Sequence, residues 1–329
     1  MARNNHGAIM KAAVYYENGG PEVLRYEDVP DPMCPDNGLL VKVEAISIEG
    51  GDTVNRLRGP LATRPHVVGY QAAGEVIEIG RGTEGFHLGQ KVVTTGTHGS
   101  HASLRAVRSA TAWPVPEGLD LRVASTIPIP FGTADNCLFE YGKLQAGDTV
   151  LIQSAASGVG VAAIQLAKRA GMRVIATASS AERLEAVRSL GVDHGIDSSN
   201  EDVAKAVQKI TDGKGVALAL DGNGGRSLEA SIASLGWKGR VAFIGFSSRE
   251  FVKVDVSSLI AGNRSIHGLA LGMEMTTPRV RRSVQRLIEE VAQGQLRVLI
   301  DREFPLAEAA AAHAYIESRR AVGRVLLVP

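Results

Sequence analysis

The segment Ser154-Ala-Ala-Ser-Gly-Val-Gly160 joins an apolar run to a helical pattern. Residues 149–154 are predicted as a buried strand, and apolar residues recur at helical spacing from Val159 to Ala170. The first N–H groups of a helix have no partner within it, and small side chains let the backbone approach a diphosphate. The turn is therefore predicted to hold the phosphates of a dinucleotide. The strict G-x-G-x-x-G pattern fails at Ala155 and Ser157, so a tight turn that binds nothing is the alternative.

The end of the next predicted strand indicates which dinucleotide this would be. NAD-binding sheets place an acidic residue there, about 20 residues after the glycine-rich turn. Here the sequence is Thr177-Ala-Ser-Ser-Ala-Glu-Arg183, with no carboxylate at the strand end. Ser179 and Ser180 can donate hydrogen bonds, and the planar guanidinium of Arg183 suits a phosphate. NADP(H) is therefore favoured over NAD(H), although Glu182 weakens this preference and Arg183 is alternatively an exposed helix residue.

Two patterns divide the chain and supply the elements around these segments. Short β-like runs at 11–16, 39–45, 74–79 and 88–93 are separated by turn residues, among them Gly50 and Gly51. From residue 124 onward, strands alternate with helices of about ten residues. This alternation indicates βαβ units, a parallel sheet and right-handed crossovers.

The predicted fold class is α/β, with a β-rich domain and a second domain inserted into it. Strands are expected at 149–154, 173–177, 216–220, 240–243, 265–268 and 324–328, and helices at 159–170, 181–190, 201–210, 226–235, 279–293 and 306–318. The predicted domains are 1–123, with a disordered lead-in at 1–9, then 124–267, and 268–329 as a return to the first domain.

Composition excludes several classes of protein. The 329 residues are 44% hydrophobic and 22% charged, which is ordinary for a folded domain. Lys+Arg is 36 against Asp+Glu 35, so nothing in the charge balance favours nucleic acid. Cys34 and Cys137 are the only cysteines, too few for a disulfide framework. No apolar stretch reaches 18 residues and the N-terminus has no apolar signal segment, so we expect a cytoplasmic protein without a membrane span.

Longer motifs follow one another along the chain in a fixed order. They include residues 10–14, 20–24, 68–74, 147–152, 191–197, 239–245, 304–309 and 323–327, and the most specific is Ala155-Ala-Ser-Gly-Val-Gly-Val-Ala-Ala-Ile-Gln-Leu-Ala167. With these motifs, nearly the whole chain resembles the zinc-independent quinone oxidoreductase branch of the medium-chain dehydrogenase/reductase superfamily.

The resemblance implies a GroES-like β-rich catalytic domain, a Rossmann domain with a doubly wound parallel sheet, and a homodimer. It implies cofactor contacts by Thr133, by Asn223, by the Gly245-Phe246-Ser247 loop and by the 2′-phosphate residues Ser179 and Arg183. With the residues derived above, the expected NADP(H)-binding set is Thr133, Ala155, Ala156, Ser157, Gly158, Val159, Gly160, Ser179, Ser180, Arg183, Asn223, Gly245, Phe246 and Ser247.

Zinc-using members of the superfamily carry ligands at positions that can be compared with this chain. The Cys of their Cys-x-x-Asp element is Glu49 here, the His of their Gly-His-Glu is Tyr70, and their third ligand falls near Ile129. Zinc needs three protein ligands, and of these three residues only Glu49 has a side chain of a type that binds zinc. We therefore expect no metal, and His98 and His101 are interpreted as loop histidines.

Without a zinc site, acceptors already activated by conjugation are favoured over ordinary alcohols. Hydride transfer to an enone leaves an enolate, which needs hydrogen-bond donors and a proton. Tyr70 is the first candidate for this donor. The alternative is that Tyr70 is an ordinary aromatic residue in the wall of the substrate cleft. Glu49 and Asp52 are expected to hold the hydrogen-bond network of the site, unless Asp52 caps a helix.

The chain also departs from the quinone reductase pattern. That pattern has a tyrosine where Val54 stands, and a glutamate where Gln71 stands. The sequence therefore predicts an NADPH-dependent, zinc-independent oxidoreductase acting on a small quinone or α,β-unsaturated carbonyl. The alternatives are an enoyl- or alkenal-type double-bond reductase without quinone activity, and a cofactor-binding member without enzyme activity.

Overall fold

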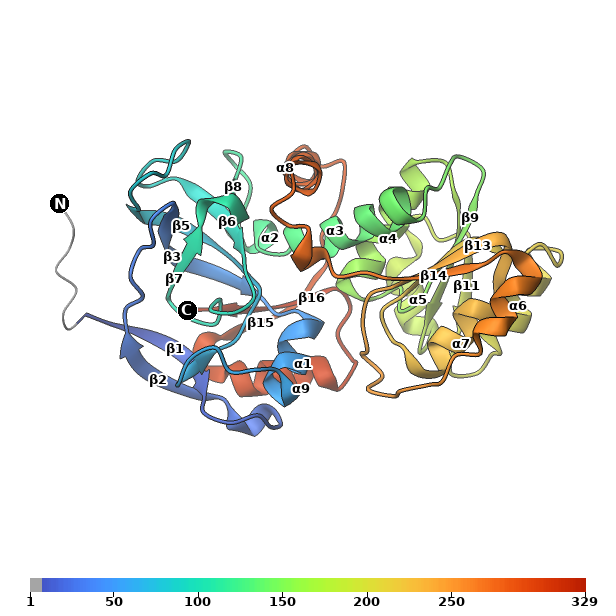
Figure 1. Ribbon diagram of the computed structural model, residues 1–329, viewed down its shortest axis with the longest axis horizontal. Helices are drawn as coiled ribbons and strands as arrows, with labels where there is room; N and C mark the ends of the chain where they lie inside the picture. The colour runs from blue at the N-terminus through green and yellow to red at the C-terminus, as the bar shows by residue number, and fades with distance from the viewer. Residues whose placement is uncertain (1–7) are drawn as a thin grey trace. The chain divides into compact units, whose positions relative to one another are not determined.

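The computed structural model describes residues 8–329 and divides into two compact units (Figure 1). The first unit comprises Met1–Ile129 and Gly272–Pro329, and the second comprises Pro130–Leu271. These boundaries fall a few residues after the expected ones at 123/124 and 267/268. Ile9, assigned above to a disordered lead-in, is the first residue of strand β1 (Ile9–Tyr15), because it pairs with Pro30. Residues 1–7 of that lead-in lie outside the described residues.

The first unit is rich in β-strands, as the short β-like runs predicted, and most of its strands pair antiparallel. β1 lies between β2 (Arg25–Pro30) and β4 (His66–Val67). A larger sheet has the order β15-β16-β3-β5-β6-β8, with β7 also pairing to β3. Its strands are β3 (Gly38–Ser47), β5 (Gln71–Ile79), β6 (Lys91–Thr95), β7 (Leu104–Arg108), β8 (Ala112–Pro114), β15 (Ile300–Pro305) and β16 (Arg324–Val328).

The α-helices in the described part of the first unit are α1 (Gly50–Arg58), α2 (Leu121–Ala124), α8 (Pro278–Ala292) and α9 (Ala309–Glu317). Another helix, α3 (Pro128–Asp135), crosses the boundary between the units. The prediction of Gly50 and Gly51 as turn residues was wrong, because they open α1. The Asp52 carboxylate accepts a hydrogen bond from the Glu49 N–H at 2.8 Å, which satisfies a donor at the helix start.

The second unit contains a six-stranded sheet in which every pairing is parallel. The order is β11-β10-β9-β12-β13-β14, the strand order of a Rossmann fold. The strands are β9 (Thr149–Ile152), β10 (Arg173–Ala178), β11 (His194–Asp197), β12 (Val216–Asp221), β13 (Leu235–Phe243) and β14 (Ser265–Gly268). The helices are α4 (Gly158–Arg169), α5 (Ala181–Arg188), α6 (Val203–Ile210) and α7 (Gly225–Ala233).

The doubly wound parallel sheet is thus confirmed. The chain runs outward from β9 to β11 and then from β12 to β14 in the opposite direction. Right-handed crossovers place the helices of these two halves on opposite faces of the sheet. The order reverses between β9 and β12, and ligands of such sheets bind beyond the carboxyl ends of the strands at this reversal. The loops that follow β9 and β12 therefore lie where a dinucleotide would bind.

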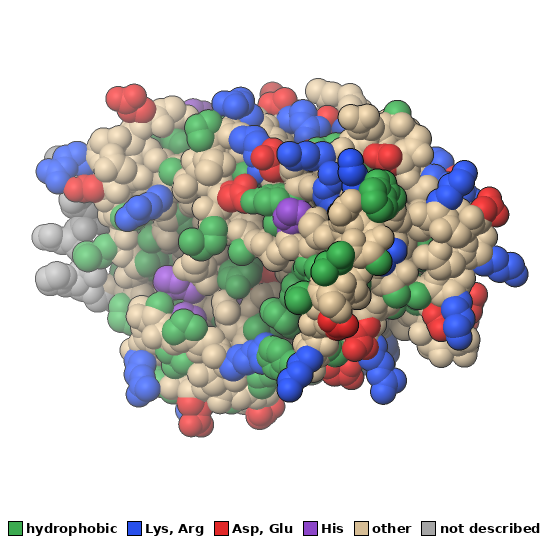
Figure 2. Space-filling model, turned by 45° about the vertical axis from the view of Figure 1, so that its right-hand side comes forward, with side chains coloured by type: hydrophobic (Ala, Val, Ile, Leu, Met, Phe, Trp, Pro, Cys, Tyr) green, Lys and Arg blue, Asp and Glu red, His purple; other side chains and the backbone are tan. Residues whose placement is uncertain are grey.

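Charged side chains of both signs are interspersed over the face shown in Figure 2, in keeping with the formal net charge of +1. Within residues 8–329, no helix has the length and apolar character needed to span a membrane.

Candidate active site

The predicted phosphate turn, residues 154–160, leads from the carboxyl end of β9 into α4. Ser157 is the N-cap of α4, and its hydroxyl oxygen accepts a hydrogen bond from the Gly160 N–H at 3.1 Å. A Cβ atom on Gly160 would lie 2.5 Å from the Ala155 carbonyl oxygen and 2.6 Å from that of Ser154. The turn is thus a close-packed bend of small residues that ends at a helix N-terminus, which fits a dinucleotide diphosphate.

Asn223, in the loop after β12, links this turn to the loop after β13. Its side-chain oxygen accepts hydrogen bonds from the hydroxyls of Ser154 and Ser247, both at 2.7 Å. Its amide nitrogen donates to the Ser227 hydroxyl at 3.3 Å. The structure therefore brings together three predicted cofactor segments, at residues 154–160, 223 and 245–247.

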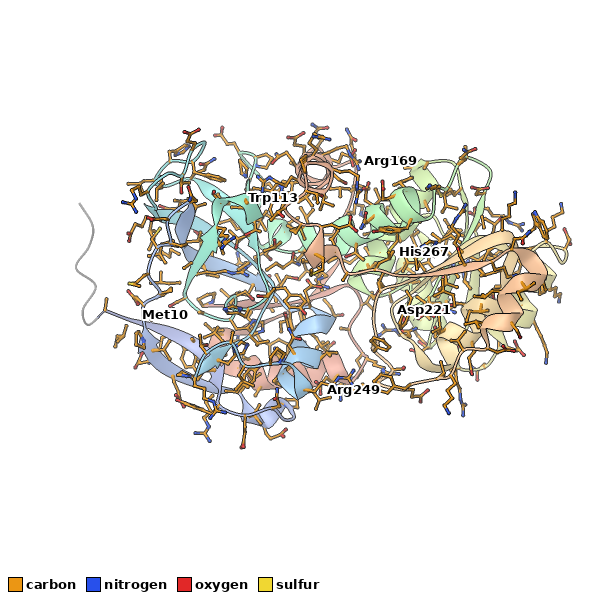
Figure 3. All side chains as sticks on the ribbon, viewed as in Figure 1. Met10, Trp113, Arg169, Asp221, Arg249 and His267 are labelled. Carbon is orange, nitrogen blue, oxygen red and sulfur yellow. The ribbon has the colours of Figure 1, made fainter. Side chains whose placement is uncertain are left out.

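Asp221, which was not among the predicted site residues, fixes the conformation of this loop. Asp221 lies at the end of β12 (Figure 3). Its side chain is completely buried. One carboxylate oxygen accepts the N–H groups of Asn223 and Gly224 at 2.8 and 2.9 Å. The other accepts the hydroxyls of Ser227 and Ser231, both at 2.8 Å. With four donors, this buried carboxylate fixes the backbone that carries Asn223.

Gln153 extends the same network across the sheet. It accepts the Thr177 hydroxyl at 2.7 Å and donates to the Ser231 hydroxyl at 3.1 Å. The network therefore joins the ends of β9, β10 and β12. A polar residue directly after a buried strand was the only sequence signal for Gln153 and Asp221.

The predicted 2′-phosphate residues lie just beyond the carboxyl end of β10. Ser179 is exposed, whereas Ser180 and Arg183 are half-buried. Ser180 is the N-cap of α5 and accepts the Arg183 N–H at 3.4 Å. The Ser180 hydroxyl also lowers the pKa of Glu182 by hydrogen bonding to its carboxylate. Ser180 thus caps α5, and Ser179, Ser180 and Arg183 stand at the edge expected for an adenosine phosphate.

The remaining cofactor candidates lie on other elements of the second unit. Thr133 is half-buried in α3 and does not join the hydrogen-bonded network described above for this unit. Gly245 follows β13, and a Cβ there would lie 3.0 Å from the Gly222 carbonyl oxygen. The Phe246 ring packs edge-to-face on Phe243 with 4.8 Å between centroids. Gly245 therefore lets the loop lie close to the one that carries Asn223.

Tyr70, the candidate proton donor, precedes β5 in the first unit and is half-buried. Its hydroxyl oxygen accepts a hydrogen bond from the Asn55 side-chain amide on α1 at 3.0 Å. Burial raises the pKa of the Tyr70 hydroxyl, and Asp52 adds to this rise. The phenol therefore keeps its proton at neutral pH, so it is suited to donate a proton rather than to accept one.

Glu49 is buried in a network with Arg324, Gln71 and Ser47. Its carboxylate accepts hydrogen bonds from the Arg324 guanidinium and, at 2.5 Å, from the Gln71 amide. Ser47 and Gln71 lie opposite each other in the β3–β5 pairing, so their side chains share one face of the sheet. Burial raises the pKa of Glu49 to about 7, while Arg324, Gln71 and Ser47 oppose this rise.

Gln71 connects this network to Ile129, which stands where zinc-using relatives have their third zinc ligand. Its side-chain oxygen accepts the Ile129 N–H at 3.0 Å. Glu49, Gln71 and Ile129 therefore lie together. They are joined by hydrogen bonds between protein groups.

Asp52 is completely buried at the third position of α1. The N-cap of α1 is Glu49 and not Asp52, which was the alternative given above; Asp52 completes the capping box when its Oδ2 accepts the Glu49 N–H. Its Oδ1 has no hydrogen-bond partner in the part of the chain that the structure describes. Burial raises the pKa of Asp52 to about 8, with Glu49 adding to the rise and the Glu49 N–H opposing it.

The two histidines considered above have different surroundings. His98 is exposed and its ring nitrogen lies 3.1 Å from the Thr97 hydroxyl. His101 is fully buried, and its Nε2 lies 2.9 Å from Nε2 of His313. Burial lowers the pKa of His101 to about 3, so this histidine is neutral near pH 7. Nδ1 of His313 in turn lies 2.8 Å from the Arg56 guanidinium.

The side chains of Glu49, Tyr70 and Ile129, at the positions of the zinc ligands in zinc-using relatives, do not form the set of three ligands that zinc needs. Across residues 8–329, no group of three or more His, Cys, Asp or Glu side chains is arranged to hold a metal ion. Tyr70 and Ile129 supply no zinc ligand of the usual types. Glu49, at the remaining position, is bonded to Arg324 and Gln71. These residues do not fit a zinc ion.

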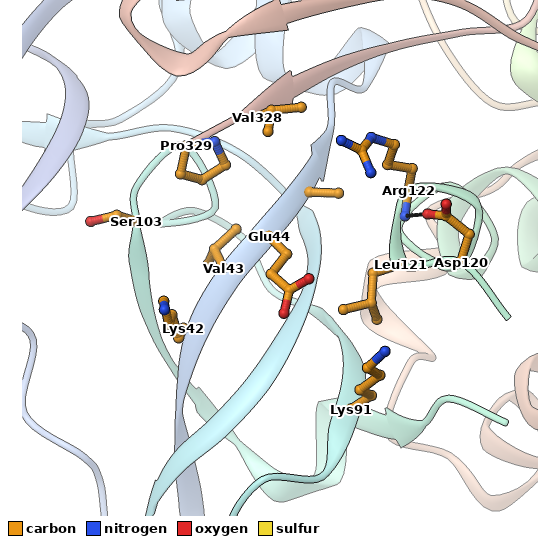
Figure 4. Close-up of a pocket in the computed structure, with 11 residues that line it drawn as sticks. Lys42, Val43, Glu44, Lys91, Ser103, Asp120, Leu121, Arg122, Val328 and Pro329 are labelled. Atoms are coloured by element: carbon orange, nitrogen blue, oxygen red, sulfur yellow. Dashed lines mark hydrogen bonds between the residues drawn. The ribbon is translucent and has the colours of Figure 1, made fainter. Parts of the chain in front are cut away.

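A pocket of about 620 Å³ in the first unit lies elsewhere and contains none of the predicted site residues (Figure 4). Its walls carry Lys42, Glu44, Lys91, Asp120 and Arg122. The Asp120 carboxylate accepts the Arg122 N–H at 2.6 Å, and the Arg122 guanidinium pairs with Glu303 at 3.0 Å. Because these opposite charges are mixed, the pocket offers no single ligand chemistry.

Comparison with known proteins identifies the family. Residues 35–117 match the model of the alcohol dehydrogenase GroES-like domain, and residues 158–291 match that of the zinc-binding dehydrogenases. A quinone oxidoreductase of Pseudomonas aeruginosa is 31% identical over 94% of this chain and 97% of its own length. The chain belongs to the quinone oxidoreductase branch of the medium-chain dehydrogenase/reductase superfamily.

Two other members are similar over the same length. A 2-haloacrylate reductase of a Burkholderia species is 31% identical over 98% of this chain and 99% of its own. The structure of Escherichia coli quinone oxidoreductase in complex with NADPH superposes with a TM-score of 0.90 at 27% identity, covering 97% of this chain and all of that one. The expected GroES-like and Rossmann domains are thus confirmed for this member of the superfamily.

Proposed function

We propose that this chain is an NADPH-dependent, zinc-independent oxidoreductase that reduces a quinone or an α,β-unsaturated carbonyl compound. The observation that carries the proposal is the 154–160 turn at the reversal of the parallel sheet, tied to Asn223 through Ser154. Relatives named quinone oxidoreductase and 2-haloacrylate reductase support the two substrate classes.

NADPH, when bound, supplies the hydride for this reaction. The first N–H groups of α4 hold its diphosphate, and Ser179, Ser180 and Arg183 hold the 2′-phosphate. Thr133, Asn223 and the Gly245-Phe246-Ser247 loop serve the nicotinamide end. Asp221 keeps Asn223 in place through the N–H bonds described above.

Tyr70 donates the proton that the reduced acceptor needs. Its O–H group bonds to the carbonyl or quinone oxygen, where negative charge develops as hydride arrives. Glu49 and Asp52 support this site without touching the acceptor, since both are buried and bonded to protein groups.

Changing Tyr70 to Phe is expected to lower the turnover number about 100-fold, because a positioned general acid contributes on that order. The measurement is NADPH oxidation with a panel of quinones and enones, together with the NADPH dissociation constant, which should not change. Unchanged turnover would remove Tyr70 from the mechanism. NADPH binding without turnover of any panel member would favour a non-enzymatic cofactor-binding role.

The panel also separates the two substrate classes. The 2-haloacrylate reductase relative favours reduction of a conjugated double bond as the second candidate function. Turnover of enones with no turnover of quinones would support that candidate and overturn quinone reduction.

Changing Arg183 to Ala is expected to raise the Michaelis constant for NADPH by about 10- to 100-fold and to leave that for NADH nearly unchanged. A hydrogen bond to a charged group contributes about 1.5–3 kcal/mol, which corresponds to a factor of this size. NADH lacks the 2′-phosphate and so does not make this bond. The measurement is steady-state kinetics with both nucleotides. An equal effect on the two would show that Arg183 does not hold a 2′-phosphate.

The proposal extends to a homodimer in the cytoplasm. β14 is an edge strand of the six-stranded sheet, and the same unit exposes Trp237, Val256 and Ile260. Both cysteines are free, which suits a reducing compartment. Light scattering of the purified protein measures the assembly, and a monomer mass would contradict the dimer.

A further inference from the structure

The phenol of Tyr70 lies along the first turns of α1. A Cβ atom on Gly51 would overlap Cε2 of the Tyr70 ring and lie 2.7 Å from its hydroxyl oxygen. Asn55 lies four residues later, on the same face of the helix, and donates to that oxygen at 3.0 Å. The ring thus occupies the space that a side chain at Gly51 would need, and its oxygen is bonded one turn further on.

The bond between Asn55 and Tyr70 has a defined direction. The side-chain nitrogen of Asn55 is a donor only, so the Tyr70 oxygen is the acceptor. The phenolic hydrogen takes no part in this bond and can be given to another oxygen. A carboxylate in place of the amide would accept that hydrogen instead.

The helix that carries Asn55 is held firmly. The neighbouring Arg56 is fully buried, and its guanidinium bonds to Glu317 of α9 at 2.5 Å and to the Gly19 carbonyl at 3.2 Å. The side chain of Asn18 donates to the Asn55 backbone carbonyl at 3.2 Å. Asn55 therefore projects from a helix that is bonded to two distant segments of the first unit.

We infer that Asn55 is a positioning residue for Tyr70, which directs the phenolic hydrogen to the acceptor and stabilises the phenolate left behind. The inference rests on the proposed function, in which Tyr70 donates the proton. In that step the proton passes from the Tyr70 oxygen to the acceptor oxygen, and the O–H electron pair stays on Tyr70. The Asn55 amide then faces a full negative charge, until water returns a proton to the phenolate.

Electrostatics agrees with this role. Burial and the nearby Asp52 raise the pKa of Tyr70 and make it a weaker acid, while the Asn55 hydrogen bond acts in the opposite direction. Gly51 contributes by leaving room for the ring.

The test combines Asn55→Ala and Asn55→Asp with Tyr70→Phe. In the otherwise unchanged enzyme, each Asn55 variant should lower kcat about 10- to 100-fold and leave the NADPH dissociation constant unchanged, because each removes a donor to a developing charge. Asn55→Asp keeps the size of the side chain but accepts a hydrogen bond where the amide donates one. In the Tyr70→Phe background, Asn55→Ala should cause no further loss, because its partner atom is gone.

A pair of neighbouring glycines supplies the matched control. Gly51→Ala should displace the Tyr70 ring and lower kcat about 10-fold, whereas Gly50→Ala meets no atom within 4 Å and should leave kcat unchanged. Both glycines lie in the first turn of α1, so the two changes raise helix propensity by a similar amount.

The outcomes separate this inference from the proposed function. If Tyr70→Phe leaves kcat unchanged, the donor role of Tyr70 fails. If Tyr70→Phe lowers kcat but Asn55→Ala lowers it equally in both backgrounds, the donor role stands and the positioning role of Asn55 is overturned. The positioning role is overturned as well if Asn55→Ala leaves kcat unchanged in the enzyme that retains Tyr70.

Discussion

Changing Gly160 to Ala is expected to weaken NADPH binding by about 10- to 100-fold. The added Cβ would lie 2.5 and 2.6 Å from two carbonyl oxygens of the phosphate turn, so the backbone of the turn must shift. An overpacked contact costs about 1–3 kcal/mol, and here that cost falls on the segment proposed to bind the diphosphate. The measurement is a fluorescence titration of the variant with NADPH.

Gly268→Ala is the matched control, because a Cβ at that position meets no atom within 4 Å. It should bind NADPH like the parent protein. Equal affinity of the Gly160 variant and the parent would show that the turn is not the diphosphate site. Circular dichroism of both variants checks that the Rossmann unit has folded.

Changing Arg324 to Met is expected to lower the free energy of unfolding by about 3–5 kcal/mol, because it leaves the buried Glu49 carboxylate without its charged partner. Met replaces the stem of the side chain, so the change mainly removes charge and donors. Arg324 also donates to the Ser47 hydroxyl and to the Ile48 carbonyl, at 2.7 and 2.6 Å. Urea denaturation of parent and variant measures the difference.

The loss should be greater at pH 8 than at pH 5. Burial raises the pKa of Glu49 above its ordinary value of 4.5, and the loss of Arg324 raises it further. A carboxyl group with a raised pKa takes up a proton on folding, so its folded state loses stability as the pH rises above 4.5. Adding Glu49→Gln to Arg324→Met should restore much of the loss. A double variant as unstable as Arg324→Met alone would contradict the charge explanation.

Much of the fold was predictable because local patterns and tertiary structure agree in the second unit. The predicted helix at 159–170 is α4 (158–169), and the predicted strand at 173–177 is β10 (173–178). Val150, Leu151 and Ile152 of β9 are fully buried, as expected for a central parallel strand. β11 was missed because His194, Gly195 and Asp197 give it no apolar run.

The first unit was less predictable, since its key helix begins with two glycines. Local propensity assigns Gly50 and Gly51 to a turn, yet α1 begins there because Asp52 caps it and Tyr70 lies over Gly51. The contact between Tyr70 and Gly51 joins residues from separate elements, which no local pattern predicts.

The sequence by itself determined the family, the parallel sheet, the place of the 154–160 turn between β9 and α4, and the lack of a three-residue zinc ligand set at the compared positions. Each depends on residue types at short spacing. Only the tertiary structure revealed the partners of those residues: Asn55 for Tyr70, Arg324 for Glu49, and Asp221 beneath Asn223. The first two partners come from other elements, and two of the four bonds of Asp221 reach Ser227 and Ser231 in α7. Strand pairing and helix packing therefore decide these partners, and the local pattern does not.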